Sequence, residues 1–354
     1  MRDLKIIFTA AGSPSAPGLI NCLHNNGERK IVVVGVDMKD DATIKQMVDL
    51  FYVVPSVNDE RYIDKLLEIC KKEKIDVLIP GTSQELCKLQ ERVVDFEALG
   101  TKVSVSRGKG LAIANDKIRL YEFMKENGFV LPTFEVARNI DEFKLACKKI
   151  GYPDKAICVK IKDGSGSRGV RLIDSSKSRF DIFVNEKPNS FYTTYEDMVA
   201  ILNEAKVFPE IMIMEYLPGN EYSVDLLADN GKTLYICGRE SNVVVASIPQ
   251  EATLKYDEKA YEISRKIVQS LGLDGNVDLD FKFDKEGNPQ LMEINPRLAA
   301  TLSVIAAGGL NLLYLRVKQL LGEELPEVSV NYGVKLKRRY LELFCDSKGA
   351  VIKF

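Results

Sequence analysis

The sequence predicts an α/β protein that opens with a doubly wound parallel sheet. Apolar, strand-like runs alternate with amphipathic helical runs through residues 1–112, as they do in successive β-α-β units. A turn rich in Gly, Pro and Ser follows the first strand, and the length of 354 residues allows two to three domains. The expected strands are residues 4–10, 31–36, 77–80 and 103–105, and the expected helices are residues 19–26, 62–72 and 84–99.

The first turn could hold a dinucleotide, with Asp37 at the end of the second strand as the ribose-binding acid. However, the spacing of Gly12 and Gly18 does not reproduce the G-x-G-x-x-G fingerprint. In addition, Pro14 and Pro17 remove two backbone donors that a pyrophosphate would need. We therefore disfavour an NAD-dependent oxidoreductase, although it stays open as an alternative.

Composition excludes several classes of function. Charged residues make up 28% of the chain and hydrophobic residues 45%, and the net charge of −2 gives no general attraction to nucleic acid or to an anionic membrane. The seven cysteines form no C-x-x-C pair, and no apolar stretch approaches the length of a membrane span, so we expect reduced thiols in a cytoplasmic protein. Because His24 is the only histidine, catalysis must use Lys, Arg and carboxylates.

The middle of the chain contains a glycine- and serine-rich loop between two expected strands. Asn115 or Asp116 caps a helix with Lys117 in its first turn, and a strand over residues 156–160 follows. The loop over residues 163–169 can fold over phosphates, since its backbone N–H groups and hydroxyls are donors, although such a loop is more often an ordinary hairpin turn. Further on we expect a strand at 170–173, an irregular segment at 175–206 with a helix at 195–203, and a strand from residue 211.

The segment from Ile211 to Asp225 is expected to form two strands separated by a Pro-Gly break. It could present backbone groups to a ligand, or it could be a simple β-hairpin with core Met and Tyr side chains. Beyond it we expect a helix at 257–271, an apolar helical run at 298–321 interrupted by Gly308-Gly309, and a charged edge strand at 335–339.

The most informative stretch is a hairpin in the C-terminal third. Apolar and polar residues alternate over residues 277–283, so Asp278 and Asp280 share one strand face, and the returning strand places Glu293 and Asn295 together by the same period of two. Mg²⁺ takes oxygen ligands of this kind, typically one or two carboxylates together with substrate phosphates. A solvated surface hairpin is the alternative, but burying Glu293 among apolar neighbours without a partner would be costly.

These motifs resemble the ATP-grasp superfamily, and most closely its carbamoyl-phosphate-synthetase-like branch. The resemblance depends on the E-I-N-P-R run from Glu293 to Arg297 after a D-x-x-G turn, and on the order of the preceding motifs. It implies a Rossmann-like pre-ATP-grasp domain at residues 1–112 and an ATP-grasp domain at 113–354. The latter would have two α+β subdomains, a small lid at about 130–217 and a metal-binding subdomain at about 218–354.

The resemblance also implies the roles of individual residues. Asp280, Glu293 and Asn295 would bind the metal, with Asp278 open as an alternative first ligand, and Arg297 and Lys160 would be the catalytic cations. The cofactors would be ATP and Mg²⁺, with Mn²⁺ as a second suitable ion. The ATP contacts would come from Lys117, Lys160, Ser165, Gly166, Ser167, Arg168, Gly169, Glu215, Tyr216, Leu217 and Glu221.

Such enzymes activate a small carboxylate as an acylphosphate, which an amine then attacks. This chain has one ATP unit where the large subunit of carbamoyl phosphate synthetase has two, so the whole of that reaction is disfavoured. A nucleotide-binding module without ligase turnover is the alternative. The acid and the amine are not identified by the sequence, residues 82–85 could contact substrate or simply cap a helix, and the apolar region at 302–315 leaves a homodimer open.

Overall fold

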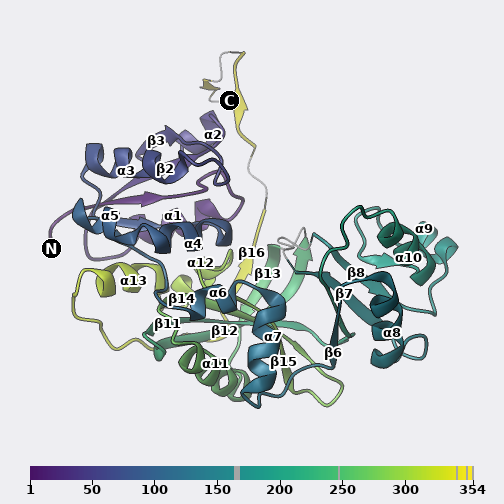
Figure 1. Cartoon of the computed structure of the whole chain (residues 1–354). Coiled ribbons are helices and arrows are strands. Elements are labelled where there is room, and N and C mark those ends of the chain that lie inside the picture. The colour runs from purple at the N-terminus through teal and green to yellow at the C-terminus, as the bar shows by residue number, and fades with distance from the viewer. Residues whose placement is uncertain (163–167, 246–247, 340–341, 348–349, 353–354) are drawn as a thin grey trace. The chain divides into compact units, whose positions relative to one another are not determined.

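A computed structural model describes residues 1–354 except 163–167, 246–247, 340–341, 348–349 and 353–354 (Figure 1). By their internal contacts these residues form two compact units. We call them the core unit, residues 1–115, 221–281 and 293–354, and the inserted unit, residues 116–220 and 282–292. The predicted fold class is confirmed, since a parallel sheet opens the chain and sheets with antiparallel strands follow.

The core unit begins with a five-stranded parallel sheet of order β3-β2-β1-β4-β5. Successive apolar side chains along these strands point to opposite faces of the sheet. One set packs against α1 and the other against α3, α4 and α5, which is the doubly wound arrangement. The elements are β1 (Leu4–Phe8), α1 (Ala16–His24), β2 (Ile31–Asp37), α2 (Ala42–Lys45), β3 (Leu50–Val53), α3 (Tyr62–Glu73), β4 (Val77–Ile79), η1 (Ser83–Glu85), α4 (Leu86–Glu91), α5 (Val93–Ala98) and β5 (Lys102–Val103).

Two details of this region differ from the sequence expectation. The single helix expected over residues 84–99 is wrong, because the chain forms three short helices with a break at Arg92, just before two β-branched valines. The short elements α2 and β3 were not expected. The first turn is held by Asp37, whose carboxylate accepts from the Gly12 N–H at 2.9 Å, so this acid has a structural role.

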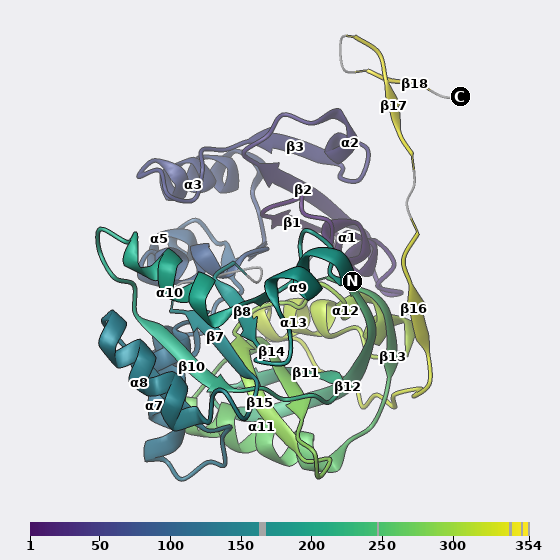
Figure 2. The same cartoon turned by 90° about the vertical axis from the view of Figure 1, so that its right-hand side faces the viewer.

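A six-stranded sheet of order β15-β14-β11-β12-β13-β16 forms the second part of the core unit. Figure 2 shows α12 and α13 between this sheet and the parallel one, and a single apolar cluster runs through α1, α12 and α13 from Phe8 to Leu227. The Gly308-Gly309 break and the edge position of β16 are confirmed. The elements are α6 (Gly110–Ala114), β11 (Glu221–Asp229), β12 (Lys232–Val245), β13 (Ile248–Leu254), α11 (Glu258–Leu271), β14 (Gly275–Phe283), β15 (Pro289–Asn295), α12 (Leu302–Ala307), α13 (Leu312–Leu320) and β16 (Lys335–Lys337).

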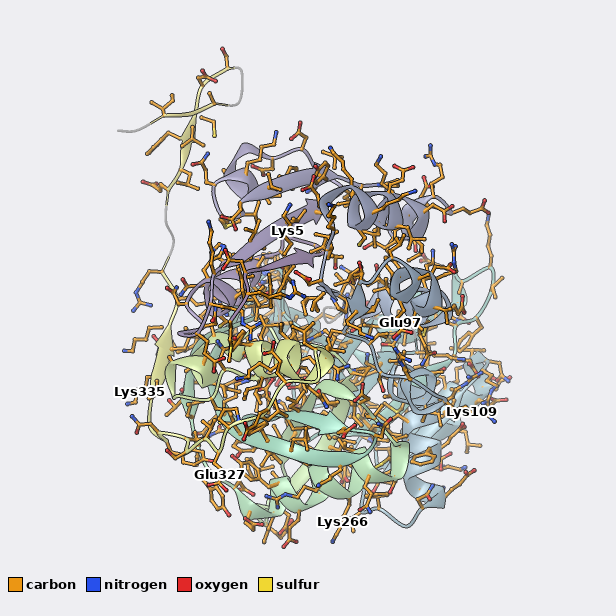
Figure 3. The ribbon with its side chains drawn as sticks, turned by 90° about the vertical axis from the view of Figure 1, so that its left-hand side faces the viewer. Lys5, Glu97, Lys109, Lys266, Glu327 and Lys335 are labelled. Atoms are coloured by element: carbon orange, nitrogen blue, oxygen red, sulfur yellow. The ribbon has the colours of Figure 1, made fainter. Side chains whose placement is uncertain are left out.

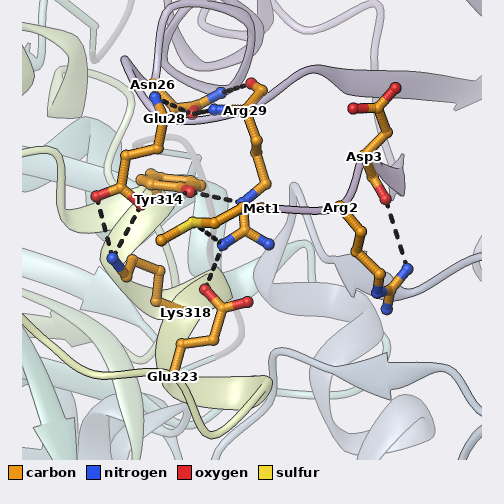
Figure 4. A network of polar contacts seen from close by, with 9 residues as sticks. All are labelled: Met1, Arg2, Asp3, Asn26, Glu28, Arg29, Tyr314, Lys318 and Glu323. Atoms are coloured by element: carbon orange, nitrogen blue, oxygen red, sulfur yellow. Dashed lines mark hydrogen bonds and ion pairs between the residues drawn. The ribbon is translucent and has the colours of Figure 1, made fainter.

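A partly buried polar network connects the parallel-sheet region to α13 (Figure 4). Arg29 Nε donates to the Tyr314 hydroxyl at 2.9 Å, and its guanidinium pairs with Glu323. Lys318 Nζ lies 2.9 Å from the Glu28 carboxylate. Because the Arg29 side chain is almost fully buried, these contacts fix the loop after α1 against the C-terminal helix and make the core unit one body.

The inserted unit is built on a five-stranded sheet of order β6-β10-β7-β8-β9. One face packs on α8 and α10 around Phe143 and Met198, and the other packs on α7 around Tyr121 and Met214. The Tyr121 hydroxyl donates to the Leu291 carbonyl at 2.6 Å, which binds α7 to the return of the hairpin. The elements are α7 (Lys117–Glu126), β6 (Phe134–Ala137), α8 (Ile140–Ile150), β7 (Ile157–Ile161), β8 (Val170–Ile173), α9 (Arg179–Asn185), β9 (Tyr192–Thr193), α10 (Tyr195–Asn203) and β10 (Ile211–Glu215).

The remaining features are the charged surface and the C-terminal hairpin. Charged residues of both signs, such as Lys266 and Glu327, are spread over different elements of the core unit (Figure 3). The chain ends in a two-stranded hairpin of β17 (Phe344–Cys345) and β18 (Val351–Ile352). All seven cysteines are free thiols, and none of the helices among the described residues is long and apolar enough to span a membrane.

Candidate metal and nucleotide site

The polar residues of the hairpin meet on one face of the six-stranded sheet. Asn295 Nδ2 donates to one oxygen of Asp278 at 3.2 Å and to one oxygen of Asp280 at 3.3 Å. The opposite face of β14 is apolar, since Leu279 and Phe281 are buried there. Asp278, Asp280 and Asn295 share one face, as expected, because side chains along a strand alternate between faces and because β14 and β15 are neighbours in the sheet.

Two neighbouring strands add partners that sequence reasoning did not identify. Ser223 on β11 donates through its hydroxyl to Asp280 at 2.6 Å. Arg239 on β12 donates to Asp225 at 2.8 Å and to Asp278 at 3.0 Å. The available signal was Asp225, a charged residue next to the apolar run Leu226–Ala228 of β11, because a buried charge requires a partner.

Arg297 lies beside this cluster on the segment after β15. Its Nη2 donates to the Asn295 amide oxygen at 3.0 Å, and its Nε donates to the Ser83 hydroxyl at 3.3 Å. Of residues 82–85, Thr82 and Glu85 form a capping box, and Glu85 is buried. The helix-cap interpretation of that segment therefore holds for these two residues, whereas Ser83 contacts Arg297.

The electrostatics of the cluster favour a divalent cation. Burial, followed by the mutual repulsion of the carboxylates, raises the pKa of Asp278 to about 7 and the pKa of Asp280 to about 8. We define the acidic cluster as Asp225, Asp278, Asp280 and Glu293, which act on one another together with the guanidiniums of Arg239 and Arg297. A divalent ion bound among these carboxylates would offset their mutual repulsion.

The donor set also fits a magnesium ion bound with a nucleotide. Within the part of the chain that the structure describes, no three His, Cys, Asp or Glu side chains converge into a ready metal cage. Mg²⁺ does not need such a cage, because it commonly binds through one or two carboxylates plus phosphate oxygens and water. Asp280, Glu293 and the amide oxygen of Asn295 could supply these protein ligands, once the Asn295 amide turns its oxygen from Arg297 toward the carboxylates.

The inserted unit contains most of the residues expected to contact the nucleotide. Lys160 is only 7% exposed on β7, where it pairs with Met212 of β10. Lys117 lies in the first turn of α7, which Asp116 caps. Arg168 is exposed at the end of the glycine-rich loop, and Gly169 has a φ of +73°. The expected contacts Ser165, Gly166 and Ser167 lie outside the described residues.

The backbone after β10 is partly engaged within the inserted unit. The Glu215 N–H donates to the Thr133 carbonyl at 3.0 Å, and the Glu215 carboxylate accepts from the Thr133 N–H at 2.8 Å. The Tyr216 N–H donates to the Ala156 carbonyl at 3.3 Å, and Leu217 is buried. Glu221 belongs to the core unit, where it is the exposed first residue of β11.

Two family models match the chain. The model described as "PylC-like, N-terminal domain" matches residues 6–104, and the model described as "ATP-grasp in the biosynthetic pathway with Ter operon" matches residues 207–340. The carbamoyl phosphate synthase large chain of Clostridium acetobutylicum is 24% identical over 293 residues, covering 78% of this chain and 25% of that protein. The arginine-specific large chain of Bacillus subtilis is 22% identical, covering 84% and 27%. This chain thus spans about a quarter of these relatives.

Solved structures share the fold at low sequence identity. An N5-carboxyaminoimidazole synthetase from Staphylococcus aureus complexed with ADP has a TM-score of 0.66 at 16% identity, covering 93% of this chain and 80% of that one. A biotin carboxylase complex from Campylobacter jejuni has a TM-score of 0.66 at 17% identity, covering 92% and 73%. The family models, the curated relatives and the fold agree with the motifs from which the resemblance was inferred. The comparisons therefore support the resemblance to ATP-grasp carboxylate–amine ligases, and the ATP-grasp family model itself matches residues 207–340.

Proposed function

We propose that this protein uses ATP and Mg²⁺ to activate a small carboxylate as an acylphosphate, which an amine then attacks. The observation that supports this proposal most directly is the acidic cluster beside Asn295 and Arg297, in which Asp225 and Asp278 are buried and the carboxylates repel one another. A surface hairpin would leave its acids solvated, whereas here Asp278 is 4% exposed.

In this proposal Asp280, Glu293 and Asn295 hold the metal, which can be Mg²⁺ or Mn²⁺. The bound ion would neutralise charge on the phosphates of ATP. The Arg297 guanidinium donates to the amide oxygen of Asn295, and this contact supports assigning Arg297 the role of stabilising charge on the transferred phosphoryl group. The proposal assigns the nucleotide contacts to Lys117, Lys160, residues 165–169, residues 215–217 and Glu221.

Lys160 gains support from its position. Lys160 is 7% exposed on β7, the strand that leads into the glycine-rich loop, so the proposal assigns it to a phosphate of a nucleotide held by that loop. Since the Glu215 N–H is used inside the unit, we assign adenine recognition there to the Glu215 carbonyl and to the backbone of Leu217.

The chemistry requires no nucleophilic side chain. A carboxylate oxygen of the substrate attacks the γ-phosphorus, and the bond between that phosphorus and the ADP oxygen breaks. The amine nitrogen then attacks the acyl carbon, phosphate leaves and the nitrogen loses a proton. Positioning and charge stabilisation supply the catalysis, which agrees with a chain whose one histidine is exposed and bonded to Asp49 at 2.9 Å.

The proposal is tested by measuring ADP and phosphate release with a panel of small acids, each with and without a panel of amines. We expect release that requires Mg²⁺, one acid and one amine, and that is lost in Glu293→Ala. Glu286→Ala, an exposed acid in the turn of the same hairpin, is the control and should retain activity. Tight binding of ATP without release under any combination would instead indicate a nucleotide-binding module. We also propose that the N-terminal domain ends at residue 112, that the ATP-grasp domain begins at residue 113, and that the protein can form a homodimer.

A further inference from the structure

Arg239 is a buried arginine held between two buried aspartates. Its side chain is 4% exposed, and those of Asp225 and Asp278 are 2% and 5% exposed. Its Nε lies 2.8 Å from Asp225 and its Nη2 lies 3.0 Å from Asp278. An arginine in this position has its charge compensated on both sides by carboxylates.

The two aspartates of β14 differ in their partners. One oxygen of Asp278 accepts from Arg239 and the other accepts from Asn295. Asp280 accepts from the neutral hydroxyl of Ser223 and from Asn295. Asp278 therefore has a direct ion pair with Arg239, which Arg239 shares with Asp225, whereas Asp280 has only neutral donors among these contacts. A cation entering the site gains more from Asp280 than from Asp278.

We propose that Arg239 is a positioning residue that holds Asp278 out of the metal shell, so that Asp280 is the first metal ligand. This inference rests on the proposed function and deepens it. When Asp278 is paired with Arg239, two protein carboxylates remain to bind the ion, Asp280 and Glu293. Two carboxylates suit Mg²⁺, which also binds phosphate oxygens of the nucleotide.

The arrangement also explains why a buried ion pair lies next to a metal site. A third free carboxylate would let a bare divalent ion bind tightly without nucleotide and would favour ions that accept more oxygen ligands, such as Ca²⁺. Engaging Asp278 with Arg239 removes that competitor. The site then selects an ion that brings its own phosphate ligands and disfavours a divalent ion bound without nucleotide.

The first test compares two isosteric substitutions, Asp278→Asn and Asp280→Asn. They lie on the same strand face and remove the same charge, so each is the matched control of the other. Binding of Mn²⁺ with a non-hydrolysable ATP analogue is measured from the loss of the free-ion paramagnetic resonance signal. We expect Asp280→Asn to weaken Mn²⁺ binding at least about ten times more than Asp278→Asn does. Equal losses, or a larger loss in Asp278→Asn, would overturn the assignment.

The second test asks whether Arg239 acts through Asp278. In Arg239→Met, Asp278 becomes free to bind the ion, so nucleotide-free protein should bind bare Mn²⁺ about tenfold more tightly than the wild type. Arg239→Lys keeps the charge and should bind like the wild type. Adding Asp278→Asn to Arg239→Met should abolish the gain.

A gain that persists without Asp278, or no gain in a folded Arg239→Met protein, would refute the inference. Circular dichroism of each variant establishes folding, and if Arg239→Met does not fold, the comparison of the two aspartates alone decides. The inference and the proposed function fail in different ways. A wild-type protein that binds no Mn²⁺ with the analogue contradicts the proposed function itself. A wild type that binds, with the two aspartates equivalent, contradicts only the role of Arg239.

Discussion

Replacing Asn295 by aspartate tests whether the acidic cluster is arranged to receive a cation. In the protein, Asn295 Nδ2 donates to Asp278 and Asp280 at 3.2 and 3.3 Å, and the substitution turns both attractions into repulsions between carboxylates. At that separation two unit charges repel by about 5 kcal/mol at an effective dielectric constant of about 20. Because a carboxyl can take up a proton instead, we expect a net loss of about 2–4 kcal/mol in the free energy of unfolding.

This loss should appear as a fall of about 3–5 °C in the midpoint of thermal unfolding, measured by calorimetry in the presence of a chelator. Excess Mn²⁺ should restore most of it, because the new carboxylate is an additional ligand for the ion. Asn288→Asp is the control, since Asn288 also donates to an aspartate, Asp284, at 3.3 Å, but in the half-buried turn of the hairpin. There we expect a change below about 1 kcal/mol.

Two results would refute this reasoning about Asn295. An unchanged midpoint of thermal unfolding in chelator would mean that a further carboxylate in the acidic cluster causes no destabilising repulsion. A lowered midpoint that Mn²⁺ does not raise would mean that the cluster does not bind cations.

Three further predictions concern the same site. Glu293→Ala should abolish turnover while the circular dichroism spectrum stays native, and full activity would reject the metal assignment. Lys160→Ala should weaken ATP binding by about tenfold or more, measured by calorimetry, whereas Lys162→Ala, which removes a cation already paired with Glu210 at 2.7 Å, should not; equal affinities in both variants would contradict the phosphate role. Because burial and repulsion raise the pKa of Asp280 to about 8, a cation that binds there must displace a proton, so Mn²⁺ affinity should fall as the pH is lowered from about 9 to about 6; a flat profile would contradict this.

Local sequence pattern was sufficient for the elements that surround the site. The two-residue period over residues 277–283 placed Asp278 and Asp280 on one face, and the contacts of Asn295 with both confirm that arrangement. Gly308-Gly309 separates α12 from α13 because two glycines weaken a helix, and helix α10 has the expected bounds. These features depend on neighbours along the chain.

The helix expected over residues 84–99 shows where local pattern was insufficient. Glu85 lies inside that expected helix, yet its carboxylate turns back to the Thr82 N–H and also accepts from Thr9, a residue distant in sequence. This contact, made at the carboxyl ends of β1 and β4, fixes the capped start of the helical segment, whereas the break in the expected helix lies at Arg92, before two β-branched valines. No period in the sequence encodes the contact with Thr9.

The sequence by itself therefore determined most of the strands and helices around the site, which hairpin residues share a face, and the resemblance to a family from the order of its motifs. Only the tertiary structure decided that Arg239, 39 residues before Asp278 in the chain, neutralises it. The physical reason is that the pair depends on the strand order β14-β11-β12, which brings β12 near β14 across β11. Strand order is set by the packing of whole faces, and the alternation within a single strand carries no information about it.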